Sequence, residues 1–142
     1  MLDETLPAWN LVRTAHVVGM RFGQLFAPMN LTPTQFDVLI HLEDDDGLTQ
    51  AELARRVLVR PQSVGVLVTS LVEQGLVVRD GPGGRGRRAG IALTDAGRKA
   101  LERTWPPVRA FNTPKALGLT SAQAAMLNEI LDRVRATLTS VD

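Results

Sequence analysis

The stretch TQAELARRVLVRPQSVGVLVTSLVEQG, residues 49–75, decides how this chain folds. Thr49 opens a capping box, in which a Thr hydroxyl accepts the backbone N–H three residues on and the acid there reaches back. A short helix over about 50–57 follows. Pro61 suits the first turn of a second helix, where its missing N–H is not needed, and Gly75 is the residue type that ends one. The stretch therefore predicts two helices joined by a tight connection.

The second helix has one apolar face and one small, neutral face. Four apolar residues recur at helical spacing and are expected to point inward: Val64, Leu67, Val68 and Leu71. The opposite, outward face carries Gln62, Val66 and Thr69, with Gly65 and Ser70 at its flanks. An ordinary exposed helix carries charge, whereas this face suits a DNA major groove, whose base edges offer amide and methyl contacts. The alternative is that another part of the protein covers it.

Two strand-like runs, residues 76–80 and 89–94, follow these helices and flank the segment RDGPGGRGRR, residues 79–88. A hairpin after two such helices is a wing, and its tip can reach phosphates or the minor groove. Arginine suits that position because its planar, weakly hydrated guanidinium fits a narrow, negative groove. Glycines let the loop lie close to a duplex. The same glycines spell G-x-G-x-x-G, but a dinucleotide site needs a helix directly after the loop, so no cofactor is expected.

Charge is distributed unevenly along the chain. The net charge is +1 overall, yet residues 55–88 hold seven arginines against two acids, a local charge of +5. Such a segment can be only a solvated face, but one this basic inside a nearly neutral chain favours an anionic partner, and nucleic acid first.

Capping boxes also open helices over about 33–44, at Thr32, and over about 121–139, at Thr120. The first is expected to bury Phe36, Leu39, Ile40 and Leu42, and the second carries an apolar stripe of Leu127, Ile130, Leu131, Val134 and Leu138. A helix from about 95 meets Pro106 and Pro107, which should kink or interrupt it. Residues 4–27 predict a long helix that is apolar on most sides, which indicates a subunit partner.

The sequence gives little support for catalysis, metal binding or a membrane-spanning segment. There is no cysteine, which excludes disulfides and thiolate metal sites, and no nucleophile or metalloprotease motif occurs. Asp44, Asp45 and Asp46 are adjacent but lack calcium-loop spacing, which favours a solvated helix end. No basic leader and no apolar run of about 18 residues is present. We therefore expect a cytoplasmic protein with no enzyme activity, no metal and no cofactor.

Several segments together resemble the MarR family of winged-helix transcriptional regulators. They are LTPTQFDVLIHL (31–42), LTQAELARRV (48–57), SVGVLVTSLVEQGLVVRD (63–80) and IALTDAGRKAL (91–101), of which LVEQGLV and LTDAG are the most specific. The resemblance implies a mainly α fold with a small β-hairpin, one MarR-like domain over 1–142. A winged helix-turn-helix lobe would span about 32–94, with dimerisation helices over about 4–27 and 95–140.

The resemblance also implies a homodimer on a pseudo-palindromic DNA operator, often released by a small aromatic or anionic ligand. Family wings commonly carry Asp-x-Arg near the tip; here Arg87 takes the Arg place but Arg85 takes the Asp place. This departure predicts a looser wing that acts more by charge alone.

The expected DNA contacts lie on the second helix and the wing. They are Arg60, Pro61, Gln62, Ser63, Val66, Thr69, Ser70, Arg79, Arg85, Arg87 and Arg88. Gln62 and Thr69 should specify the base sequence, Gln62 by pairing bidentately with adenine, and Val66 can contact a thymine methyl. Arg60 and Ser63, nearer the edge, should hold phosphates.

A ligand site is expected on the first helix, where Trp9, Arg13, His16 and Met20 share one face. An aromatic ring, a cation, an imidazole and a thioether suit an aromatic carboxylate. The alternative interpretation is that this face packs against the partner subunit of a dimer, with Arg13 and His16 at a solvated part of the interface.

The sequence thus predicts a homodimeric DNA-binding regulator, and a repressor in particular because it could occlude polymerase. One alternative is a winged-helix module that grips an acidic protein partner. An enzyme is the other, disfavoured by the missing catalytic groups.

Overall fold

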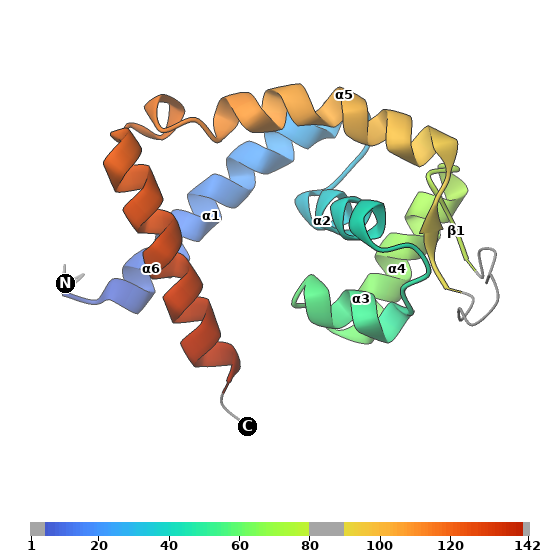
Figure 1. The fold of residues 1–142 in the computed structure, drawn as a ribbon, viewed down its shortest axis with the longest axis horizontal. Coiled ribbons are helices and arrows are strands. Elements are labelled where there is room, and N and C mark those ends of the chain that lie inside the picture. Colours follow the sequence, from blue (N-terminus) through green and yellow to red (C-terminus); the bar gives the residue numbers. More distant parts are fainter. Residues whose placement is uncertain (1–4, 80–89, 141–142) are drawn as a thin grey trace. The chain divides into compact units, whose positions relative to one another are not determined.

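The computed structural model describes residues 5–79 and 90–140. They form two compact units, Met1–Thr104 and Trp105–Asp142, each described by itself below. The elements follow one another as α1 (Pro7–Phe26), η1 (Ala27–Met29), α2 (Pro33–Asp44), α3 (Gln50–Arg56), α4 (Pro61–Glu73), β1 (Val77–Val78), β2 (Ala92–Leu93), α5 (Asp95–Phe111), η2 (Lys115–Leu117) and α6 (Ser121–Thr139) (Figure 1). The expected fold class, mainly α with a small β-hairpin, is confirmed.

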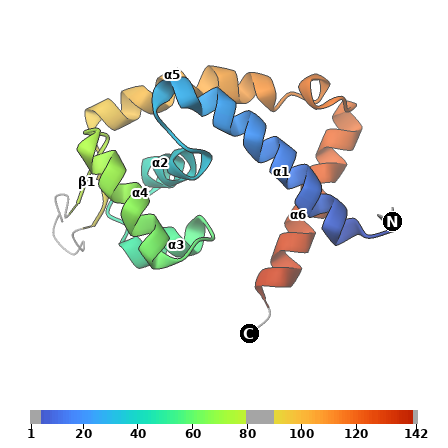
Figure 2. The ribbon, with the colours of Figure 1, turned by 180° about the vertical axis from the view of Figure 1, so that it is seen from behind.

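The core of the first unit lies among α2, α3 and α4. Leu39, Leu53, Val64 and Leu71 each have 0% of their surface exposed. The ring of Phe26, at the end of α1, stacks on a ring of α2 with centroids 4.9 Å apart. Helices α3 and α4 pack against each other most extensively and lie side by side in both views (Figures 1 and 2). This packing presents the opposite face of α4 to solvent.

The three predicted helix starts are confirmed. The Thr32 hydroxyl accepts the Gln35 N–H at 3.1 Å and Gln35 accepts the Thr32 N–H at 3.0 Å. Thr120 and its partner three residues on make the same reciprocal pair. The Thr49 hydroxyl accepts the N–H of Glu52 at 3.1 Å. These bonds satisfy donors that the first helical turn leaves without partners.

Among the described residues, the strands are shorter than the predicted runs, of which residues 80 and 89 lie outside the description. β1 and β2 pair antiparallel, with Val77 opposite Leu93 and Val78 opposite Ala92. An additional bridge joins Leu48 to Ile91, so the segment before α3 also lies against the base of the wing.

Two expectations about helices need correction. In α2, Ile40 is only half-buried, whereas Val38 is fully buried. The inward face is therefore rotated from the one expected. In α5, of the two outcomes expected at Pro106 and Pro107, a kink or an interruption, the interruption does not occur, because the helix runs on to Phe111. The carbonyl groups that these prolines leave without a helical donor belong to residues 102 and 103, both exposed, so water can satisfy them.

The helix α6, in the second unit, has no buried residue. Most of its predicted apolar stripe is exposed in the single chain, with Ile130 51% and Leu138 69% exposed, whereas Leu131 and Val134 are half-buried. In the first unit, α1 likewise buries only Phe26, and Trp9 and Val17 are more than half exposed. None of the described helices is both long and apolar enough to cross a membrane. Apolar surface of this extent indicates an interaction partner.

Candidate nucleic-acid interface

The connection between α3 and α4 is tight and contains a residue of unusual backbone conformation. Leu58 has φ of 58°, in the left-handed region, and the N–H of Val59 returns to the carbonyl of Ala54 at 3.0 Å. Arg60 then precedes α4 with φ −72° and ψ 145°, and its side chain makes no cap hydrogen bond. Pro61 occupies the first helical position, as the sequence predicts. The turn thus leaves the side chains of the first turn of α4 exposed.

The faces of α4 lie as the periodicity predicts. Val64, Val68 and Leu71 are fully buried, while Leu67 is only half-buried. On the outer face, Val66 is 73% exposed. The other side chains expected to contact DNA there are exposed or half-exposed: Pro61, Gln62, Ser63, Thr69 and Ser70.

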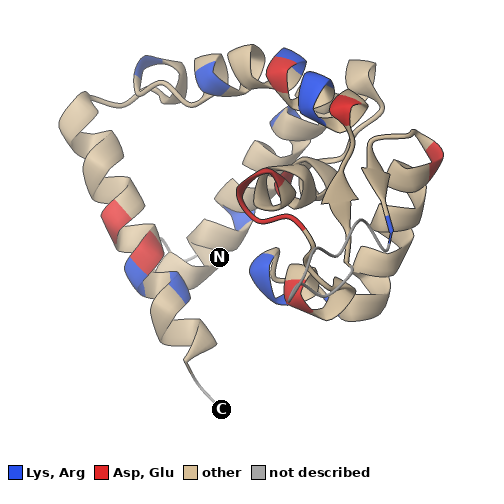
Figure 3. Cartoon of the chain, turned by 45° about the vertical axis from the view of Figure 1, so that its right-hand side comes forward, with Lys and Arg blue, Asp and Glu red and all other residues tan. Residues whose placement is uncertain are grey.

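This outer face is only shallowly hollowed, and it is uncharged apart from Glu73 and the overlying Arg79. An open depression on it is lined by Gln62, Gly65, Val66, Thr69, Ser70, Glu73 and Arg79. Figure 3 shows α4 without charge except near its C-terminal end, where Glu73 lies. A helix face that is uncharged over most of its length can approach the base edges of a duplex closely.

Arg79, at the end of β1, reaches across the outer face of α4. Its Nη2 donates to Thr69 Oγ1 at 2.8 Å and to the carbonyl of Gly65 at 3.2 Å. Its Nη1 donates to Gln50 Oε1 at 3.2 Å. The Gln50 side chain in turn donates to the carbonyl of Pro61 at 2.9 Å. We call this set of bonds the Arg79 network; it joins β1 to the starts of α3 and α4.

Sequence reasoning assigned Arg79 to DNA and missed Gln50 altogether. The network connects residues 29 positions apart in the chain, so no local spacing could have indicated it. The only signal was Gly65, a glycine within a helix. A Cβ added there would lie 2.9 Å from Gln50 Nε2, so the glycine makes room for the amide.

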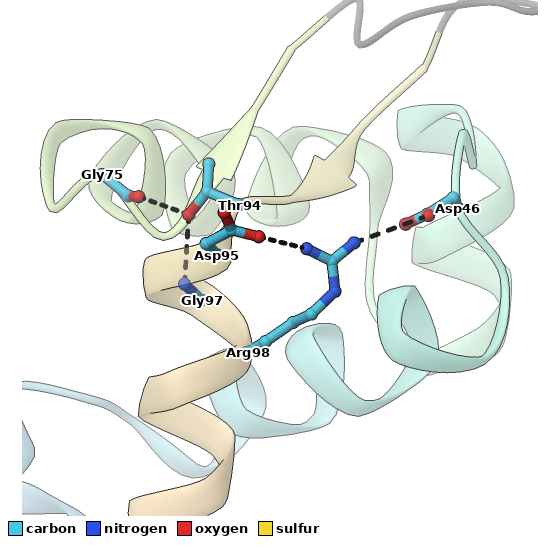
Figure 4. Close-up of polar contacts among 6 residues, drawn as sticks. All are labelled: Asp46, Gly75, Thr94, Asp95, Gly97 and Arg98. Carbon is cyan, nitrogen blue, oxygen red and sulfur yellow. Dashed lines mark hydrogen bonds and ion pairs between the residues drawn. The ribbon is translucent and has the colours of Figure 1, made fainter.

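The LTDAG motif fixes the base of the wing to α5 (Figure 4). The Thr94 hydroxyl donates to the carbonyl of Gly75 at 2.6 Å and accepts the N–H of Gly97 at 3.0 Å. Gly75 itself has φ of 75°, the left-handed conformation expected of a helix-ending glycine. One hydroxyl therefore ties the end of α4 to the start of α5.

The acidic segment after α2 pairs with arginines. Arg56 Nη2 lies 3.1 Å from Asp45 Oδ2, and Arg98 Nη2 lies 4.0 Å from Asp46 Oδ2 (Figure 4). Among the residues that the structure describes, no group of three or more His, Asp or Glu side chains could hold a metal ion. The structure thus gives these aspartates a role in linking α2 to α3 and α5.

The remaining predicted contacts fall into two groups. Arg85, Arg87 and Arg88 lie outside the described residues. The four residues of the expected ligand site are all exposed on α1: Trp9, Arg13, His16 and Met20. They recur at spacings of four, three and four, so one face of the helix carries them all.

One carboxyl group on α2 has an altered acidity. Burial raises the pKa of Asp37 above its ordinary value of 3.8, and the nearby His41 partly offsets this. The His41 Nδ1 lies 2.8 Å from the Asp37 backbone carbonyl oxygen and 3.4 Å from its carboxylate.

Comparison with known proteins gives consistent results along almost the whole chain. The MarR family model matches residues 29–88. The HTH-type transcriptional repressor Rv2887 of Mycobacterium tuberculosis is 28% identical over 134 residues, which are 94% of this chain and 96% of the relative. An uncharacterized HTH-type transcriptional regulator of Bacillus cereus is 30% identical over 138 residues, 94% of this chain and 92% of the relative.

Solved structures of Rv2887 share the fold. Its complex with DNA superposes with a TM-score of 0.74 at 28% identity, covering 93% of this chain and 98% of the other. Its complex with salicylic acid gives a TM-score of 0.71 at 30% identity, covering 93% of this chain and 97% of the other.

Proposed function

Because this chain belongs to the MarR family of transcriptional regulators, whose members are not enzymes, we propose that it represses transcription by binding a specific double-stranded DNA operator as a homodimer. The single observation that carries the proposal is the outer face of α4. It is open to solvent and uncharged apart from Glu73 and Arg79, while the segment of the sequence around it is strongly basic. The DNA-bound structure of the relative Rv2887 supports the same use of the fold.

Within the DNA-binding lobe, about residues 32–94, α4 and the wing have different roles. Gln62 and Val66 read bases, because they lie on the exposed part of α4 nearest its N-terminus, which enters the groove. Arg60 and Ser63 hold phosphates beside them. The wing arginines Arg85, Arg87 and Arg88 supply charge that does not depend on sequence.

The dimer forms through the helices outside this lobe, about residues 4–27 and 95–140. The apolar surface on α1 and α6 supports this assignment, since α6 buries none of its side chains within the single chain. A two-fold dimer reads two half-sites about one helical turn apart, so the operator is a pseudo-palindrome.

An aromatic carboxylate releases the protein from DNA. Rv2887 has been crystallised with salicylic acid and with p-aminosalicylic acid, which are members of this chemical class. On this chain, the exposed set Trp9, Arg13, His16 and Met20 provides an aromatic surface and a cation that suit such a ligand. The competing role for the same residues is packing against the partner subunit.

Selection from a pool of random DNA duplexes tests the proposal. The purified protein should recover one pseudo-palindromic sequence, and salicylate should lower its affinity for that sequence. A salt titration with random duplex separates this function from the alternative of an acidic protein partner. Recovery of no sequence above background, together with no salt-dependent binding, would rule out DNA as the partner.

A further inference from the structure

We propose that Arg79 is a positioning residue for base reading: its guanidinium holds α4 and the Thr69 hydroxyl in one fixed arrangement against α3 and the base of the wing. The inference rests on the proposed function, because it concerns how the outer face of α4 reads DNA. It differs from the role that the basic segment suggests for Arg79, which is a contact to phosphate.

The hydrogen bonds of Arg79 point inward to the protein. A guanidinium has five N–H donors, and three of them serve the Arg79 network: both on Nη2, to Gly65 and Thr69, and one on Nη1, to Gln50. Two acceptors lie on α4 and the third on α3. Because the three acceptors come from two helices, one side chain fixes the angle at which α4 leaves the turn.

Gln50 completes the arrangement. Its amide oxygen accepts from Arg79 and its amide nitrogen donates to the carbonyl of Pro61, in the first turn of α4. The amide lies over the helix at Gly65, where an added Cβ would be 2.9 Å from Gln50 Nε2 and would require the amide to shift. The start of α3 and the start of α4 are therefore joined through one amide group.

The Arg79 network limits which groups on the DNA bases the Thr69 hydroxyl can bind. Its hydroxyl donates to the carbonyl of Gly65 at 2.9 Å and accepts from Arg79 at 2.8 Å. A hydroxyl has one proton and two lone pairs, so only one acceptor position remains. Thr69 can then accept from an amino group, as on adenine or cytosine, but cannot donate to guanine or thymine oxygens.

The network should matter more in the complex than in the free protein. All three Arg79 bonds are solvent-exposed, and water can replace an exposed bond at little cost. Under a bound duplex, water is excluded and an unpaired polar group costs far more. Loss of Arg79 should therefore reduce sequence-specific binding while changing stability little.

The test measures the affinity of Arg79→Met for two duplexes, the one recovered by selection with the wild-type protein and a random-sequence control, over a range of salt concentrations. We expect roughly tenfold weaker binding to the selected duplex. Random duplex should be affected much less, and the slope of log affinity against log salt should stay at the wild-type value. Repeated selection with the variant should show a relaxed preference at one base position in each half-site.

If Arg79 instead contacts a DNA phosphate, the affinities and the salt dependence should change differently. If Arg79→Met weakens both duplexes equally and lowers the salt slope by about 0.9 for each phosphate that the protein no longer neutralises, the positioning role is wrong. It is equally wrong if neither affinity nor base preference changes. The matched variant Arg60→Ala, at the predicted phosphate contact, shows how large such a slope change is in this protein.

Thr69→Val keeps the inference testable if Arg79→Met does not fold, because it removes the hydroxyl while keeping shape and charge. It should also weaken the selected duplex and relax the preference. The double variant should cost no more than the larger single change, since the two side chains act together; full additivity would contradict the network. If the wild-type protein selects no sequence, the proposed function fails, whereas this inference fails only on the variants of a protein that does select.

Discussion

Gly97 lies directly against the backbone carbonyl of Leu76, so closely that a Cβ on Gly97 would be 2.1 Å from that oxygen. The same glycine donates its N–H to the Thr94 hydroxyl, which also binds the carbonyl of Gly75. The end of α4, the first strand of the wing and the start of α5 thus meet at one point. This junction fixes the base of the wing to α4 and α5, beside the links that the Arg79 network and the Leu48–Ile91 bridge provide.

Gly97→Ala should lower the free energy of unfolding by about 1–3 kcal/mol, because the added methyl group must displace backbone that cannot move easily. Chemical denaturation measures this. Ala96→Ser, at the neighbouring exposed position of α5, is the control and should change stability by less than about 0.5 kcal/mol. Equal stability of the Gly97→Ala variant and the wild type would mean that the junction is open.

Much of the fold and of the candidate DNA interface could be predicted from the sequence, because helix starts and helix faces depend on residues close together in the chain. Helix starts follow from capping boxes such as Thr32, and the faces of α4 follow from the spacing of apolar residues. The rest depends on contacts between distant segments. The bond from Arg79 to Gln50 has no local pattern, and the inward face of α2, with Val38 rather than Ile40 buried, is set by the neighbouring helices.

Asp37→Asn should make the protein more stable near neutral pH. Burial raises the pKa of the Asp37 carboxyl in the folded state, so the folded protein holds this proton more tightly than the unfolded chain does. Folding therefore loses stability as pH rises from the ordinary value of 3.8 through the raised one. Asparagine has no charge to bury, and its advantage should shrink toward about pH 4. Denaturation over this pH range measures it; an advantage independent of pH would contradict the assignment.

Replacing Ile130 by Glu should convert the proposed homodimer into a monomer. Ile130 is 51% exposed in the single chain, and a carboxylate at a buried apolar interface has no partner. Sedimentation at micromolar concentration should show a dimer for the wild type and a monomer for the variant. Asp132→Ala, on the same helix but at an exposed charged position, should remain dimeric. A monomeric wild type that binds the palindrome at full affinity would contradict the proposed assembly.

Replacing Arg85, Arg87 and Arg88 together by Ala should weaken binding to every duplex alike. Each phosphate that the wing no longer neutralises should lower the slope of log affinity against log salt by about 0.9. The base preference recovered by selection should stay the same. Unchanged affinity and slope would mean that the wing does not touch DNA.

The most direct test of the central claim, that the outer face of α4 reads DNA, is selection of binding sites with Gln62→Ala. Gln62 is exposed in the first turn of α4 and offers both a donor and an acceptor to adenine. The variant should bind the selected sequence about 1–3 kcal/mol more weakly and lose the preference at one base position of each half-site. Random duplex should bind as before, because Gln62 carries no charge. If the variant returns the wild-type motif at wild-type stringency, α4 does not read bases through this face.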